Sequence, residues 1–130
     1  MNSKGFLCLI VVSLCFLQCK KDNSNYQGYF YSKVPGDDAQ LTLYLDGHIQ
    51  GLLPFVKTDS IGFTADSIKK YALKLNVQEG KHKLEAKDQN GLTRSSGGFK
   101  VTKNKTSSSG NIGGHELILE NGELRVGIYF

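Results

Sequence analysis

The feature that most constrains the fold is a set of glycine-containing turn dipeptides between segments of alternating apolar and polar residues. Asp46-Gly47, Asn90-Gly91 and Asn121-Gly122 tolerate the positive φ angles of tight hairpin turns. Residues 40–45 alternate before the first of these pairs, and residues 123–130 alternate after the last. This spacing predicts an antiparallel β domain.

Seven or eight short strands are predicted between residue 26 and the end of the chain. Pro54 ends one of them, because proline has no amide hydrogen for a sheet ladder. Glu79-Gly80 is interpreted as the turn of a further hairpin. The fold class predicted is therefore all-β, a small antiparallel β-sandwich of the immunoglobulin-like kind. Besides the two alternating segments above, strands are expected at residues 49–53, 72–78, 81–88 and 115–120 and around Phe99 and Val101.

Two segments break the alternation. Residues 57–70 are polar and predict a loop with one helical turn, in which Asp66 caps a segment containing Ile68, Tyr71 and Ala72. Residues 103–114 are rich in serine and glycine, and predict a flexible connection with little to pack.

The amino terminus has the pattern of an export signal. Lys4 precedes an apolar run over residues 5–17, which is shorter than the roughly 20 residues that span a bilayer. The run ends in Leu17-Gln18-Cys19 and resembles the lipobox of bacterial lipoproteins. The resemblance implies a signal peptide over residues 1–18, acylation of Cys19 and a tether over residues 19–25, before a domain over residues 26–130. Ordinary secretion with cleavage nearby and an uncleaved anchor are the alternatives.

Anchoring at Cys19 implies a place in the cell envelope, at the outer membrane. The stretch after Cys19, with its lysines and Asp22, also resembles the export tag of surface lipoproteins, so the periplasmic and surface faces both stay open. Cys8 and Cys15 lie in the segment removed, and the mature domain is then expected to fold without a disulfide.

The central segment resembles a PEGA-type module, a small envelope-associated β-sandwich. The resemblance lies in residues 43–47, in Gly51 to Pro54, and in residues 79–86, which include Gly80-Lys81-His82. It implies a hairpin that ends in proline and a second hairpin laid over the first. It implies no catalytic residue.

The charge pattern argues against a nucleic-acid partner. The formal net charge is +4, and the lysines are spread along the sequence, whereas nucleic-acid binders concentrate them on one face. A solvated surface is the expectation, with weak attraction to an anionic lipid or glycan as the alternative.

No catalytic, cofactor-binding or metal-binding residue is predicted. The histidines lack the short spacing of a zinc site. His82 is in phase with Leu84, which predicts a partly buried structural role, and His48 and His115 are expected to be solvated. Asp88 begins an Asp-Gln-Asn-Gly stretch that is ordinary hairpin chemistry and not a calcium loop.

Tyrosines supply the candidate binding surface. Tyr44 and Tyr129 each lie opposite the apolar residues of their own strand, and Tyr29 and Tyr31 share one face of another. Outward tyrosines can stack on sugars or anchor a protein, or they can form cross-strand pairs that only stabilise a sheet.

The function expected is a non-catalytic binding or structural role of a lipid-anchored protein towards an envelope glycan or protein. A small carrier of an apolar ligand and an enzyme with a dispersed site are the alternatives. The oligomeric state is left open.

Overall fold

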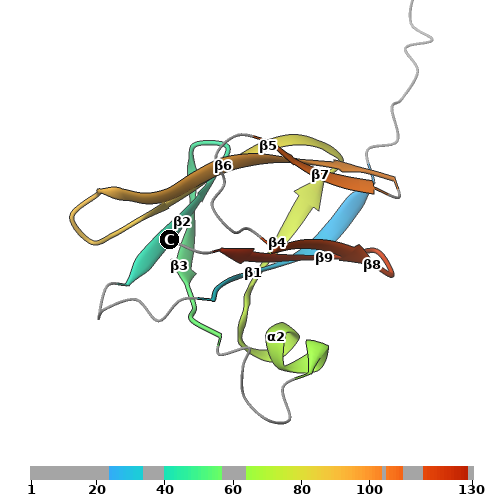
Figure 1. Cartoon of the computed structure of the whole chain (residues 1–130), viewed down its shortest axis with the longest axis horizontal. Helices are drawn as coiled ribbons and strands as arrows, with labels where there is room; N and C mark the ends of the chain where they lie inside the picture. Colours follow the sequence, from blue (N-terminus) through green and yellow to red (C-terminus); the bar gives the residue numbers. More distant parts are fainter. Residues whose placement is uncertain (1–23, 34–39, 57–63, 104, 110–115, 129–130) are drawn as a thin grey trace, which may run out of the picture.

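The protein folds as a sandwich of two β-sheets with one short helix outside it (Figure 1). This computed structural model describes residues 24–33, 40–56, 64–103, 105–109 and 116–128. The signal and lipidation predictions, including Cys19, concern residues outside these ranges. Among the described residues, no helix is long and apolar enough to cross a bilayer. The predicted all-β sandwich is confirmed.

The two sheets differ in size and in the strands that they take from the chain. The four-stranded sheet has the order β4 (Leu73–Gln78), β1 (Asn25–Ser32), β9 (Glu123–Ile128) and β8 (Glu116–Glu120). The five-stranded sheet has the order β3 (His48–Leu53), β2 (Leu41–Leu45), β5 (Gly80–Lys87), β6 (Thr93–Thr102) and β7 (Lys105–Ser109). The helix α2 covers Ala65–Tyr71.

The core lies between the sheets, because alternate residues of nearly every strand turn their apolar side chains inward. Burial of this apolar surface is the main force that holds the sheets together. The fully buried side chains include Phe30, Leu43, Leu84, Leu124 and Ile128.

Two of the predicted hairpins have the predicted turn geometry. Asp46 and Gly47 have φ angles of 53° and 79°, and Asn121 and Gly122 have 52° and 76°. Positive φ at both central positions is the type I′ geometry that suits the twist of paired strands. The hairpins β2–β3 and β8–β9 are thereby confirmed.

The hairpin β5–β6 is also confirmed, with a different turn. Only Gly91 has a positive φ there, at 78°. The Asp88 side chain accepts hydrogen bonds from the backbone N–H groups of Asn90 and Leu92, at 2.9 and 3.0 Å. This carboxylate therefore serves the turn, as ordinary hairpin chemistry predicts.

The hairpin predicted at Glu79-Gly80 is wrong. The chain crosses there from one sheet to the other, so that β4 pairs with β1 while β5 pairs with β2 and β6. The apolar side chains of β4 and β5 face one core in either arrangement. The alternation of apolar and polar residues therefore could not distinguish two strands paired in one sheet from two strands that face each other across the core.

The predicted antiparallel sandwich contains one parallel strand pair that the sequence did not indicate. β1 pairs in parallel with β9, from Gln27 opposite Glu123 to Ser32 opposite Ile128. The first and last described strands are thus neighbours in the middle of the four-stranded sheet. Almost the whole described chain serves as the connection between them.

The predicted helical turn is present, but its cap is misplaced. The N-cap is Thr64 and not Asp66, which lies in the first turn. The Ser67 hydroxyl accepts a hydrogen bond from the Thr64 backbone N–H at 3.5 Å. Ile68 is buried, and Tyr71 is exposed.

The predicted flexible connection is wrong for residues 105–109. These residues form β7, which pairs with β6 in a register that sets Thr106 opposite Val101 and Ser107 opposite Lys100. Residues 110–115 lie outside the described part. Serine-rich composition suggested a linker, but an existing edge strand offers backbone partners to almost any sequence.

Candidate functional site

The register of the five-stranded sheet brings Tyr44 beside exposed apolar residues on its outer face. Tyr44 lies opposite Ile49 of β3 on one side and opposite Glu85 of β5 on the other. Two residues earlier in β2, and on the same face, Thr42 lies between Leu52 of β3 and Lys87 of β5. We call this set of six residues the Tyr44 patch: Thr42, Tyr44, Ile49, Leu52, Glu85 and Lys87.

The Tyr44 patch is apolar at the sheet edge and charged towards the middle. Ile49 and Leu52 are 66% and 58% exposed, although an edge strand could have carried polar side chains there. The Lys87 ammonium lies 4.6 Å from the centre of the Tyr44 ring, a cation–π contact. Glu85 is 4.0 Å from the same ammonium. An aromatic ring between aliphatic and charged side chains is typical of a binding surface.

Lysines gather on this outer face, contrary to the expectation of evenly spread charge. The alternation of β5 and its pairing with β6 place Lys81, Lys83, Lys87 and Lys100 on one side of the sheet. Glu85 is the carboxylate among them, and it also pairs with the Lys83 ammonium at 3.1 Å. The positions are distant in sequence, and only strand register collects them.

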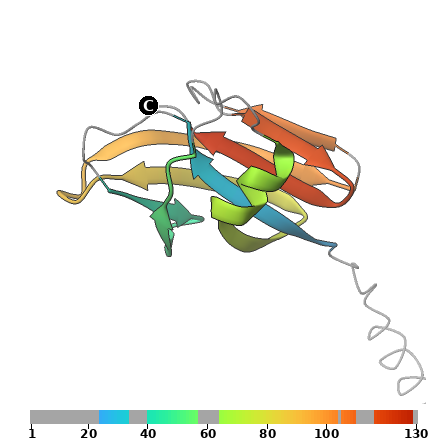
Figure 2. The ribbon, with the colours of Figure 1, turned by 90° about the horizontal axis from the view of Figure 1, so that it is seen from below.

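The other predicted tyrosines are differently placed. Tyr29 and Tyr31 do share a face, but they are buried under α2 and Val56, where they pack with Ile68. Figure 2 shows α2 lying across β1 on this outer face of the four-stranded sheet. Their prediction as outward tyrosines is wrong, because the polar segment before β4 folds back over them. Tyr129 lies outside the described residues.

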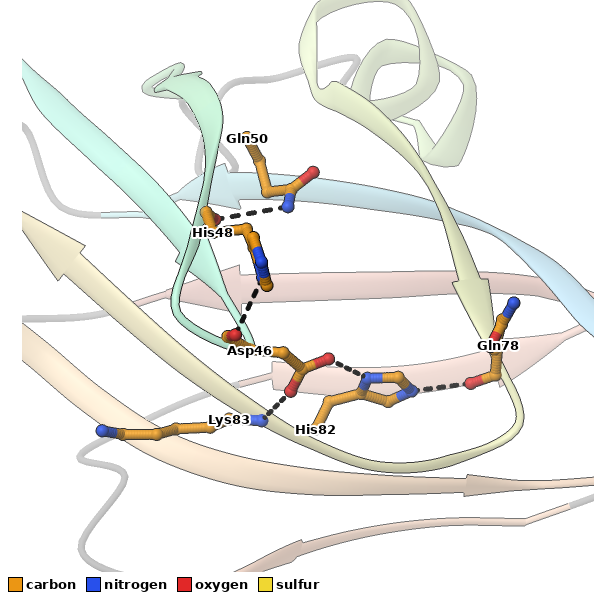
Figure 3. Close-up of polar contacts among 6 residues, drawn as sticks. All are labelled: Asp46, His48, Gln50, Gln78, His82 and Lys83. Atoms are coloured by element: carbon orange, nitrogen blue, oxygen red, sulfur yellow. Dashed lines mark hydrogen bonds and ion pairs between the residues drawn. The ribbon is translucent and has the colours of Figure 1, made fainter.

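A second polar cluster centres on His82 and ties the two sheets together (Figure 3). The His82 ring lies 5.2 Å from the Phe99 ring, centre to centre, at the inner edge of the five-stranded sheet. Its Nδ1 contacts Asp46 Oδ2 at 2.7 Å, and its Nε2 contacts the Gln78 carbonyl oxygen of β4 at 2.7 Å. Both ring nitrogens are therefore held by oxygen atoms of the protein itself.

Asp46 follows the last residue of β2 and extends the hydrogen bonding between β2 and β5 by one residue. Its Oδ1 accepts the backbone N–H of Lys83 at 2.8 Å, and its own N–H donates to the Lys83 carbonyl at 2.8 Å. The Asp46 carboxylate thus accepts the hydrogen bond of the Lys83 amide in β5. In a longer β2 strand, a backbone carbonyl would have accepted it. The sequence marked Asp46 only as a turn residue. Nothing in its spacing signalled the contact with His82.

This arrangement gives His82 a structural role. A general base needs a ring nitrogen directed at the proton that it removes. Both nitrogens of His82 are already engaged within the protein. Its partial burial agrees with the prediction. His48 is exposed as predicted, with Nδ1 3.0 Å from the Asp46 carbonyl oxygen, and His115 lies outside the described residues.

The described residues form neither a metal site nor an enclosed ligand cavity. No group of three potential metal-ligating side chains occurs among them. A shallow hollow of about 240 Å³ lies at one end of the sandwich. It is open and partly polar, unlike the enclosed apolar cavity that a carrier of an apolar ligand needs. Its lining residues are Tyr26, Lys103, Leu119, Asn121 and Gly122.

Comparison with known proteins found no match for this chain among protein-family models, curated proteins or solved structures.

Proposed function

We propose that this protein is a lipid-anchored component of the bacterial cell envelope that binds an envelope protein through the Tyr44 patch, without catalysis. The observation that carries this proposal is the exposure of Ile49, which lies opposite Tyr44, and of Leu52, which lies opposite Thr42 in the same patch. Exposed aliphatic side chains next to an aromatic ring lose unfavourable contact with water when a partner covers them.

The anchoring part of the proposal rests on the sequence around Cys19. A basic residue, a short apolar run and a cysteine before a polar stretch match a lipoprotein signal. Acylated lipoproteins carry at least two chains, which is enough for durable attachment, whereas one chain alone is marginal. The outer membrane is the expected location, and the resemblance to envelope-associated PEGA-type modules supports it.

An envelope glycan is the second candidate ligand for the same patch. Tyr44 offers a ring for stacking, and Glu85 and Lys87 offer groups that hydrogen-bond to sugar hydroxyls. The position of Lys87 over the Tyr44 ring favours the protein partner. A sugar would have to displace that ammonium before it could stack.

Intact-cell photo-crosslinking of the wild type beside an Ile49→Ser/Leu52→Ser variant tests the proposal. We expect one envelope protein to be captured by the wild type and lost in the variant. The matched control is Lys70→Ser/Lys74→Ser, which changes two exposed residues away from this sheet and should leave capture intact.

Equal capture by the wild type and the Ile49→Ser/Leu52→Ser variant would contradict the protein-binding proposal. If purified envelope glycan is retained instead and Tyr44→Ala abolishes retention, the glycan becomes the ligand. The acylation of Cys19 is checked separately, by mass spectrometry of the amino-terminal peptide from wild type and Cys19→Ala.

A further inference from the structure

The described chain begins at one identifiable end of the sandwich. The Ser24 carbonyl accepts a hydrogen bond from the Glu79 N–H at 2.9 Å, where the chain crosses between the sheets. Glu79 Oε1 accepts the Lys103 N–H at 3.1 Å, and the Tyr26 hydroxyl donates to the Thr102 carbonyl at 3.4 Å. The start of β1, the crossover and the β6–β7 turn therefore lie together, at the right of Figure 1.

Four lysines lie at this same end, and we call them the lysine end: Lys81, Lys100, Lys103 and Lys105. All four are exposed. Lys81 of β5 lies directly opposite Lys100 of β6, and Lys105 of β7 lies opposite Thr102. Like charges directly opposite each other destabilise a sheet, so this arrangement costs the isolated domain stability.

No carboxylate in the described part of the chain forms an ion pair with the lysine end. Among the described residues, none of its four ammonium groups lies within ion-pair distance of a carboxylate. Glu79 is near, but one of its oxygens is held by the Lys103 backbone. Glu120 and Glu123 flank the β8–β9 turn of the other sheet, and they pair with Arg125 and Lys69.

The proposed anchor lies very close to this end in the sequence. Ser24 is the fifth residue after Cys19, and an extended chain spans at most about 3.5 Å per residue, or roughly 17 Å over these five steps. The Debye length is about 8 Å at physiological ionic strength. An acylated Cys19 thus holds Ser24, at this end of the sandwich, within about two Debye lengths of the lipid headgroups, even with the chain fully stretched.

We infer that the lysine end docks on the anionic phosphate headgroups of the membrane that holds the acylated Cys19. The inference rests on the proposed anchoring and extends it from attachment to orientation. Headgroup phosphates supply the facing pair Lys81 and Lys100 with an opposite charge that no described carboxylate supplies. The hollow that Lys103 lines lies between the β6–β7 and β8–β9 turns, at this same end.

Docking by the lysine end leaves the Tyr44 patch clear of the membrane. Tyr44 lies opposite Glu85, four residues along β5 from Lys81. At about 3.3 Å per residue, the patch stands roughly 13 Å farther along the sheet. The domain then presents its partner-binding face beside the membrane and not against it.

Lysine reactivity in the anchored protein tests the inference. The purified acylated full-length protein is placed in vesicles of phosphatidylcholine, or of equal parts phosphatidylcholine and phosphatidylglycerol, and its lysines are acetylated and quantified by mass spectrometry. With the anionic lipid we expect roughly fivefold slower labelling of each docked lysine. High salt should remove the difference, and Lys70 and Lys74 should label equally in both vesicles.

A Lys81→Gln/Lys100→Gln variant provides the second measurement. It should reduce the protection of the remaining Lys103 and Lys105, whereas Lys70→Gln/Lys74→Gln should leave that protection unchanged. Because all four substitutions are on exposed side chains, the fold should survive in both variants.

The outcomes separate the two proposals. Equal labelling of the lysine end in both vesicles, with acylated Cys19 confirmed by its mass, overturns docking and leaves anchoring intact. An unmodified Cys19 overturns both. If soluble alginate protects these lysines as well in phosphatidylcholine vesicles as phosphatidylglycerol does, an acidic glycan replaces the lipid and the inference is overturned.

Discussion

Both sheets of the sandwich alternate inward and outward side chains, but the outer face of one is covered by a helix and the outer face of the other is exposed to water. On the four-stranded sheet, Tyr29 and Tyr31 lie under α2 and are buried. On the five-stranded sheet, Tyr44 lies under one lysine side chain, and its neighbours Ile49 and Leu52 face water. An outward position in a strand therefore predicts exposure only where no other segment returns to cover it.

The charges of the two faces differ in the same way. Two carboxylates of the four-stranded sheet are matched, Glu123 with Lys69 of α2 and Glu120 with Arg125. On the five-stranded sheet the lysines outnumber the carboxylate Glu85. Among the described residues, the covered face thus has two matched ion pairs, whereas lysines are in excess on the open face.

The largest effect expected from breaking this contrast is on stability, at Tyr31. This side chain is 1% exposed, so Tyr31→Ala should leave a cavity beneath α2 and lower the free energy of unfolding by about 3–5 kcal/mol. Tyr44→Ala should cost less than about 1 kcal/mol, because it loses only a cross-strand pair and a cation–π contact. Urea unfolding of both variants measures the difference. Equal losses would mean that the two faces are buried alike.

A smaller effect is expected at the link between the sheets. Asp46→Ala removes the acceptor of the Lys83 N–H and the partner of His82 Nδ1, and should cost about 1–3 kcal/mol. Asp66→Ala, on the exposed first turn of α2, is the matched control and should change stability by less than about 0.5 kcal/mol. Thermal unfolding compares the two. An Asp46→Ala variant as stable as the wild type would remove the proposed structural role of the cluster.

The smallest effect is expected at the ion pair of the covered face. The hydrogen bond from Lys69 to Glu123 raises the pKa of the Lys69 ammonium above its usual 10.5. A raised pKa in the folded state means stabilisation that is complete below 10.5 and lost as the pH rises through the folded-state value. Lys69→Gln should therefore lie slightly below the wild type in urea midpoint at pH 7 and match it in strong alkali. A difference that persists in alkali would have another cause.

Local chemistry was readable from the sequence, and long-range pairing was not. The dipeptides Asp46-Gly47 and Asn121-Gly122 fix a turn by the φ angles that they permit, so their hairpins were predicted correctly. Glu79-Gly80 permits a turn as well, but which sheet receives the next strand depends on distant residues. The Asp46–His82 contact joins two elements through the finished fold, and no local pattern encodes it.

The candidate site was predictable in part for the same reason. The outward position of Tyr44 follows from strand periodicity alone. The exposure of Ile49 and Leu52 depends on β3 being an edge strand, and the gathering of lysines depends on the pairing of β5 with β6. Both features depend on the order and register of the strands in the sheet, which cannot be read from a single sequence.

The parallel pairing of β1 with β9 has a consequence for the order in which the domain is completed. β1 is the first described strand to be synthesised, and β9 is the last. Until β9 arrives, one edge of β1 has unpaired backbone groups, and the inner residues of the four-stranded sheet have no full cover. The domain therefore cannot finish folding piece by piece along the chain, and the four-stranded sheet reaches its native form only when the final described strand is available to pair with β1.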